Sequence, residues 1–229
     1  MFIGHYAVAL AAKKAAPRTS LGLLFIAAQF LDLLWPVLLL LGVEQVRLHA
    51  TDNSFLQLDF VNYPFSHSLL GSVIWAVAFG GLVYLVKRDV RAALVIAGCV
   101  VSHWVLDLFT HVPDLPLTFT GAAREGLGLW NFPVATIIVE TLLYGVGIVL
   151  YVQATRATDR IGKFGFWSLV GFLFLLYVSS IIGPPPPDVS VIGYMGLLLW
   201  IFVVWAWWSD KHRTMIVEKS RQDPSAAKT

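Results

Sequence analysis

The run from Ser102 to His111 (SHWVLDLFTH) places two histidines and a carboxylate in an otherwise apolar stretch. In a helix His103, Asp107 and His111 recur at i, i+4 and i+8, so their side chains project from one face. A carboxylate near bilayer depth costs about 2.5–3.5 kcal/mol on insertion scales, so it usually has a partner and a function. Imidazoles and carboxylates are ligands of Zn²⁺. The spacing therefore indicates a metal site, or alternatively a structural hydrogen bond between helical turns.

Composition predicts a membrane protein. The chain is 58% hydrophobic and 13% charged, whereas soluble domains are about 45–50% apolar and about 25% charged. The small net charge of +2 does not favour a nucleic-acid partner, and a single cysteine excludes a disulfide framework or a cysteine zinc site. We expect an all-α, polytopic membrane protein with six transmembrane helices and a short N-terminal re-entrant or interfacial helix. The predicted spans are approximately 21–43, 68–86, 92–109, 133–152, 165–182 and 189–208.

The basic residues predict the orientation of these spans. All but two of the 16 Lys and Arg residues, Arg47 and Arg124, lie in the N-terminal segment, in alternate connections or in the tail. The positive-inside rule then places both termini in the cytoplasm. We predict one membrane domain over residues 1–217 and a disordered cytoplasmic tail over 218–229, which is polar throughout.

Other ionisable residues fall in the outer half of the predicted bundle. His67 lies at the outer mouth of the second span, Glu140 about 10 Å inside the fourth span, and Asp32 near the midplane. Each has a simpler interpretation: an interfacial histidine for His67, a protonated acid bonded to neighbouring hydroxyls for Glu140, and a local pair or cap for Asp32. Their common depth favours one shared, outward-facing pocket.

The N-terminal segment raises a separate question. Residues 2–12 are apolar but too short to span, and Lys13 and Lys14 follow them, which does not favour a cleavable signal peptide. A surface helix is one interpretation. If the segment instead folds back into the bundle, His5 reaches the depth of Asp32, because re-entrant backbone is tolerated where protein surrounds it.

These positions together resemble the bacterial inner-membrane family of membrane-bound metal-dependent hydrolases. The matching features are His5, an acidic residue in the first span (Asp32), the pair His67-Ser68, and His103 with Asp107; they cover roughly the first 110 residues. The usual family pattern has Pro-Asp-x-Asp where this chain reads Phe30-Leu31-Asp32-Leu33. The resemblance implies a divalent metal bound by these side chains and a multi-pass protein of the bacterial cytoplasmic membrane.

The function expected from this site is hydrolysis of a lipid-linked or periplasmic ester or phosphoester, with Zn²⁺ the expected cofactor. The predicted metal ligands are His5, Asp32, His67, His103 and Asp107; the predicted catalytic residues are Glu140, as general base, and Asp32; the predicted substrate contacts are His111 and Ser68. Two alternatives remain: a transporter coupled to protons or metal ions, and a non-catalytic scaffold with a structural metal.

Overall fold

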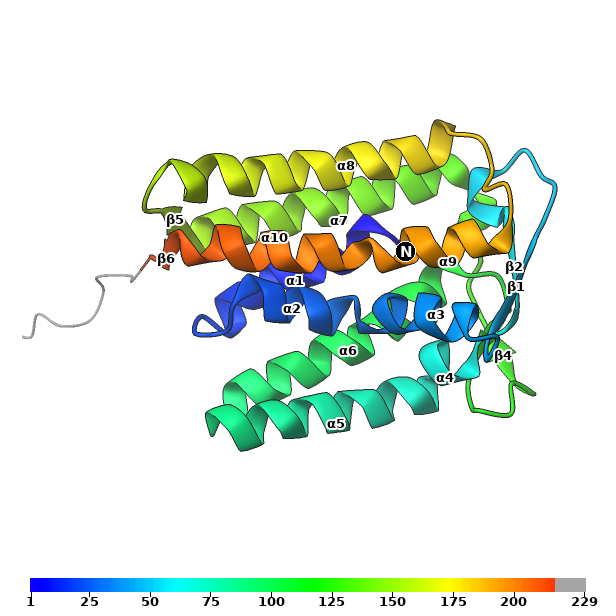
Figure 1. The fold of residues 1–229 in the computed structure, drawn as a ribbon, viewed down its shortest axis with the longest axis horizontal. Coiled ribbons are helices and arrows are strands. Elements are labelled where there is room, and N and C mark those ends of the chain that lie inside the picture. The colour runs from blue at the N-terminus through cyan, green and yellow to red at the C-terminus, as the bar shows by residue number, and fades with distance from the viewer. Residues whose placement is uncertain (217–229) are drawn as a thin grey trace, which may run out of the picture.

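The fold is known from a computed structural model that describes residues 1–216, so the tail predicted over 218–229 lies outside the described residues. Helices dominate it, and the six strands pair only into three short two-stranded antiparallel sheets (Figure 1). The helices are α1 (Ile3–Ala15), α2 (Leu21–Ala28), α3 (Phe30–Leu40), α4 (Pro64–His67), α5 (Leu69–Lys87), α6 (Val90–Thr110), α7 (Pro133–Ala154), α8 (Phe166–Ile182), α9 (Val189–Leu197) and α10 (Leu199–Lys211). The strands are β1 (Gln45–Leu48), β2 (Leu58–Asn62), β3 (Leu115–Pro116), β4 (Arg124–Glu125), β5 (Thr155–Ala157) and β6 (Arg213–Met215).

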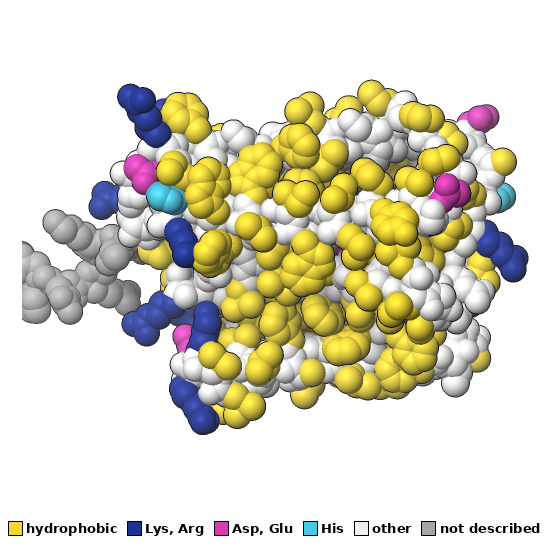
Figure 2. Space-filling model, in the orientation of Figure 1, with side chains coloured by type: hydrophobic (Ala, Val, Ile, Leu, Met, Phe, Trp, Pro, Cys, Tyr) yellow, Lys and Arg dark blue, Asp and Glu magenta, His cyan; other side chains and the backbone are white. Residues whose placement is uncertain are grey.

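The described residues confirm the all-α membrane fold and the predicted spans. Five helical segments are long and apolar enough to cross a membrane, and α2 with α3 makes a sixth if that bent pair counts as one span. The five are Leu69–Lys87, Val90–Thr110, Pro133–Ala154, Ile161–Ile182 and Val189–Lys211. Hydrophobic side chains cover most of the length of the molecule, as expected of a surface that faces lipid (Figure 2).

The first span is not one straight helix, as the hydropathy suggested. It breaks at Gln29, where α2 and α3 meet at a bend of 59°. The break turns Asp32, in the first turn of α3, toward the interior, and it places the Ala28 carbonyl at the end of α2. Broken helices at membrane depth are tolerated where protein surrounds the freed backbone groups.

The short helix α1 lies inside the bundle rather than on its surface. It packs against α2, α6 and α7, and Ile3, His5 and Leu10 are almost fully buried. Gly147 of α7 permits this close packing, because a Cβ there would lie 2.6 Å from the Ala7 carbonyl oxygen. Of the two interpretations of this segment, the structure therefore shows the one folded into the bundle.

The two ends of the bundle differ in charge. Lys and Arg side chains gather at the end that carries β5 and β6, on the left in Figure 2. The opposite end carries the hairpin of β1 and β2, with the short α4 after it, and the hairpin of β3 and β4. These two hairpins lie in the connections 44–63 and 111–132, at the end opposite to most of the basic residues.

Candidate metal centre

The three residues expected on one face of α6, His103, Asp107 and His111, divide into two groups. His103 and Asp107 are 0% and 2% exposed, and His103 Nε2 lies 3.2 Å from Asp107 Oδ2. His111 does not continue this face inward, because it is the C-cap of α6 and its backbone is extended. Its Nδ1 instead lies 2.9 Å from Asp114 Oδ1. Helical spacing thus brings together one pair, while His111 forms a separate group nearer the end of the helix.

Helices α3 and α4 bring two further metal-donor side chains, Asp32 and His67, to His103 and Asp107. Asp32 Oδ1, after the break in the first span, lies 3.6 Å from His103 Nε2 and 3.4 Å from His67 Nε2. His67 Nε2 also lies 3.9 Å from Asp107 Oδ2. The four donor atoms therefore form a closed ring whose sides measure 3.2–3.9 Å.

This spacing suits a small divalent cation. Ligand atoms bound tetrahedrally to Zn²⁺ at about 2.0–2.1 Å lie about 3.3 Å from one another, close to the sides of the ring. His103 Nε2 is fully buried and forms no hydrogen bond among the described residues, and its polar neighbours are the carboxylate oxygens of Asp107 at 3.2 Å and Asp32 at 3.6 Å. The spacing fits a metal ion held by Asp32, His67 and His103, with Asp107 as the fourth member of the ring.

Each histidine of the ring is oriented by its other nitrogen. His103 Nδ1 lies 2.7 Å from the Ala28 carbonyl, which can only accept, so Nδ1 carries the proton and Nε2 is left as a ligand. His67 Nδ1 lies 2.7 Å from Ser66 Oγ. Ser66 Oγ in turn donates to Glu44 Oε2 at 2.6 Å. Metal-binding histidines are commonly oriented in this way by outer hydrogen bonds.

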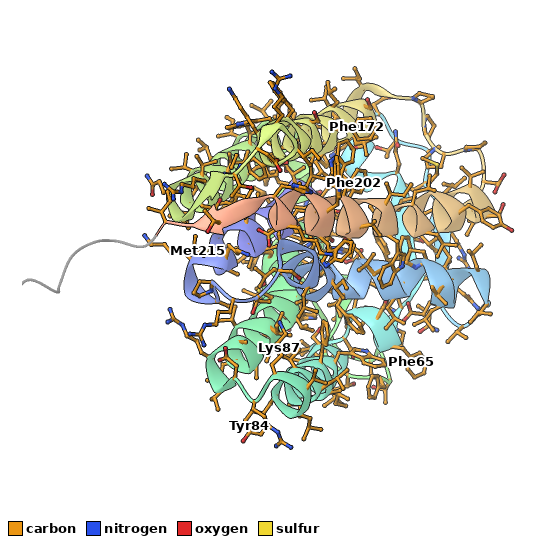
Figure 3. The ribbon with its side chains drawn as sticks, turned by 60° about the vertical axis from the view of Figure 1, so that its left-hand side comes forward. Phe65, Tyr84, Lys87, Phe172, Phe202 and Met215 are labelled. Carbon is orange, nitrogen blue, oxygen red and sulfur yellow. The ribbon has the colours of Figure 1, made fainter. Side chains whose placement is uncertain are left out.

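Local sequence explains how His67 comes to face the ring. Pro64 begins α4, where its missing N–H costs nothing. Ser68 ends α4 after four residues and caps α5, with its Oγ accepting from the Gly71 N–H at 3.0 Å. Buried Glu44 accepts the backbone N–H groups of Phe65 and Ser66, both at 2.8 Å, and so fixes this turn to the chain before β1. Figure 3 labels Phe65 at this end of the bundle.

The N-terminal helix adds a second group of donors. His5 Nε2 lies 3.1 Å from Asp107 Oδ1, and the His5 ring stacks on His103 with centroids 3.6 Å apart. His5, His103 and Asp107 are thus also spaced to hold an ion. The Met1 amino group contacts the same Asp107 oxygen at 2.6 Å. His5, which was expected to reach the depth of Asp32, thus contacts Asp107.

Glu140 of α7 is bonded to α1 and not to the hydroxyls on its own helix. Its Oε2 accepts the N–H groups of Phe2 at 2.8 Å and Gly4 at 3.3 Å. The neighbouring hydroxyls of Thr136 and Tyr144 donate to backbone carbonyls instead. Since both bonds use Oε2, Oε1 remains available to the cavity that Glu140 lines.

A cavity of about 200 Å³ adjoins the ring. Asp32, His67, Asp107, His111 and Glu140 line it, so it joins most of the predicted site residues. Its aromatic walls come from Trp35, Phe55, Phe60, Trp130 and Tyr177. The predicted substrate contact Ser68 is fully buried as the cap of α5 and is not part of this lining. His103 and His5 are both buried and do not line the cavity.

Three residues of the site were not predicted from the sequence. Glu44 and Ser66 look like ordinary polar residues of a loop, and only their contacts connect them to His67. Trp130 resembles an interfacial tryptophan, but its ring lies 4.1 Å from that of His111 beside the cavity. A possible signal for Ser66 was its position directly before His67.

Comparison with known proteins identifies no relative. No protein-family model matches the chain, and no curated protein or solved structure is significantly similar to it. The resemblance to membrane-bound metal-dependent hydrolases therefore stays a prediction, and the functional argument depends on the geometry of the site.

Proposed function

We propose that the protein is a metal-dependent hydrolase embedded in the bacterial cytoplasmic membrane, acting on a lipid-linked or periplasmic ester or phosphoester. The observation that carries the proposal is the ring of His67, Asp32, His103 and Asp107, with the unpartnered His103 Nε2, beside a cavity. The basic end of the bundle then faces the cytoplasm. Met1 does not lie at that end, because its amino group contacts Asp107 inside the bundle, so the expected cytoplasmic N-terminus is not supported.

In this proposal the ring residues hold the ion, and His5 positions Asp107 through its contact with Oδ1. A zinc ion bound there would polarise the scissile bond and lower the pKa of a water molecule toward 7. Asp32 is the most exposed of the four, with 27% of its side chain accessible, so it lies on the side from which a substrate enters.

The remaining chemistry belongs to Glu140 and His111. Glu140 Oε1 receives the proton from the attacking water, while Oε2 stays bound to the Phe2 and Gly4 N–H groups. His111, held by Asp114, contacts the substrate from the wall of the cavity. A volume of about 200 Å³ accommodates the reacting group but not a lipid chain, so the rest of a lipid-linked substrate would extend into the bilayer.

Metal content of the detergent-purified protein tests the centre itself. We expect about one equivalent of a divalent metal in the unaltered protein and its loss in His67→Ala, His103→Ala and Asp107→Asn. His49→Ala is the matched control, because His49 is exposed on the loop between β1 and β2. Equal metal content in His103→Ala and His49→Ala would contradict the centre.

Turnover tests the reaction separately. Glu140→Gln keeps a hydrogen-bond acceptor for the N–H groups of Phe2 and Gly4, so it should retain the metal. It should lower the hydrolysis of bis(p-nitrophenyl) phosphate or p-nitrophenyl butyrate by about 10²–10⁴-fold, the usual contribution of general base catalysis. A different result would support a transporter instead: metal flux into proteoliposomes that is abolished by Asp32→Asn, with no turnover of either ester.

A further inference from the structure

A second and larger cavity lies at the basic end of the bundle, where nothing in the proposed reaction requires one. It has a volume of about 780 Å³, and two connections line it: residues 16–19 between α1 and α2, and residues 87–92 where α5 turns into α6. Figure 3 labels Lys87 at this turn. Val90 lies 17 residues before Asp107 on α6, so the two cavities are about 25 Å apart along that helix.

The lining of this second cavity is strongly cationic. Arg18, Lys87, Arg88 and Arg91 contribute positive charge, and Asp89 contributes the single carboxylate. Asp89 is engaged as the cap of α6, accepting from the Ala92 N–H at 3.0 Å. Within residues 1–216 none of the four cations forms a salt bridge. The cavity thus concentrates positive charge that the described protein does not neutralise.

A buried hydroxyl points to a ligand independently of charge. Thr19 lines the cavity and is 1% exposed, yet its Oγ1 has no hydrogen-bond partner among the described residues. A buried hydroxyl without a partner is unfavourable, and a bound ligand would relieve it. The positive end of the α6 dipole also lies at this cavity, because α6 begins at Val90.

The backbone at Arg88 adds a third observation. Arg88 has a φ of +54°, and within residues 1–216 it is the only residue other than glycine with a positive φ. It ends α5 in the left-handed conformation, a position at which glycine is usual because a side chain is strained there. The Arg88 guanidinium lies 5.8 Å from the centroid of the Tyr84 ring, and Arg88 also lines the cavity.

We propose that this cavity binds a phosphate-bearing anion at the cytoplasmic face, held by Arg18, Lys87, Arg88 and Arg91 with a hydrogen bond from Thr19. Basic pockets between transmembrane helices on the cytoplasmic side accommodate anionic lipid head groups, and a soluble phosphate compound presents the same chemistry. Positive charge anywhere at this end would satisfy membrane topology, whereas the open cavity and the buried hydroxyl of Thr19 are additional features.

Native mass spectrometry of the detergent-purified full chain tests the proposal. The protein is incubated with phosphatidylglycerol or with phosphatidylcholine, and retained lipid is counted for the unaltered chain, Arg88→Gly and Arg91→Gln. Arg88→Gly relieves the strained backbone, so any loss of binding is not a loss of folding. Lys14→Gln is the matched control, because Lys14 is exposed near the same end but does not line the cavity.

The unaltered chain and Lys14→Gln should retain phosphatidylglycerol in preference to phosphatidylcholine. Each arginine variant should bind it about fivefold more weakly, the effect expected for removing one basic residue at a membrane surface. If inorganic phosphate at millimolar concentration displaces the lipid, the site serves a soluble phosphate compound; retention of the lipid identifies the head group as the ligand. Equal retention of the two lipids, or equal losses in Lys14→Gln and Arg91→Gln, would overturn the proposal.

Discussion

The contact between Ser66 and His67 allows a sharp test of how the metal centre is held. Ser66→Ala removes the hydroxyl that lies 2.7 Å from His67 Nδ1 and 2.6 Å from Glu44 Oε2. Glu44 keeps its two backbone N–H donors, so the turn at α4 should survive. What changes is the imidazole, which loses the partner that fixes the proton on Nδ1 and directs Nε2 to the ring.

The expected loss follows from that single contact. A neutral hydrogen bond contributes about 0.5–1.5 kcal/mol, and 1.4 kcal/mol corresponds to a factor of ten in affinity. We therefore expect Ser66→Ala to weaken Zn²⁺ binding about tenfold, at the lower end of the 10–100-fold range for outer-sphere partners. Competition with a chromophoric chelator measures the dissociation constant, and the visible spectrum of the Co²⁺-substituted protein reports a change at the ligands.

Ser72→Ala is the matched control. Ser72 is also fully buried, but its Oγ donates to the Ser68 carbonyl on α5 and contacts no residue of the ring. It should leave both the zinc affinity and the Co²⁺ spectrum unchanged. If Ser66→Ala binds zinc as tightly as Ser72→Ala does, the hydrogen bond does not orient His67 and the reasoning is refuted.

Three further results are expected. Asp210→Asn should lower the free energy of unfolding by about 3–5 kcal/mol, because it leaves buried Lys13 without its ion-pair partner at 2.7 Å. The double variant Lys13→Met/Asp210→Asn should recover part of that loss when its denaturation is compared with that of Asp210→Asn. The Gly162 N–H and the His212 ring hold the pKa of Asp159 below its usual value. The ionised Asp159 carboxylate therefore stabilises the folded protein above about pH 4, and this stabilisation is lost as the pH falls through the lowered pKa. Asp159→Asn should accordingly flatten the decline in Tm between about pH 5 and pH 3. Chelation should lower the Tm, and Zn²⁺ at 100 times its Kd should restore about 2.7 kcal/mol; a Tm that zinc does not move would contradict binding to the folded state.

Periodicity and depth predicted much of the site. The α6 spacing placed His103 and Asp107 on one face, and their contact follows from one turn of helix. Asp32, His67 and Glu140 were expected in one pocket because burying each alone is costly, and all three line the cavity. Helical spacing misled only at His111, where the helix ends and the side chain turns to Asp114.

Long-range contacts explain what the sequence did not reveal. The bend at Gln29 carries no proline and no glycine, since Pro36 lies about two turns later inside α3. The buried position of α1 depends on Gly147, more than 130 residues away, which admits its backbone. Glu44 reaches Ser66 across the hairpin of β1 and β2. Local patterns cannot report such pairings, because each residue alone is compatible with a surface loop or an ordinary helix.

The irregular parts of the backbone are those that build the centre. Asp32 follows a break in a helix, and His67 ends a helix of only four residues. Consistency with local rules fails in natural proteins mainly where function requires it. Regular helices alone would have placed His103 and Asp107 together but would have left them without the donors that close the ring. The departures from regular structure therefore bring Asp32 and His67 to His103, and these three side chains form a group between α3, α4 and α6 that could hold a cation.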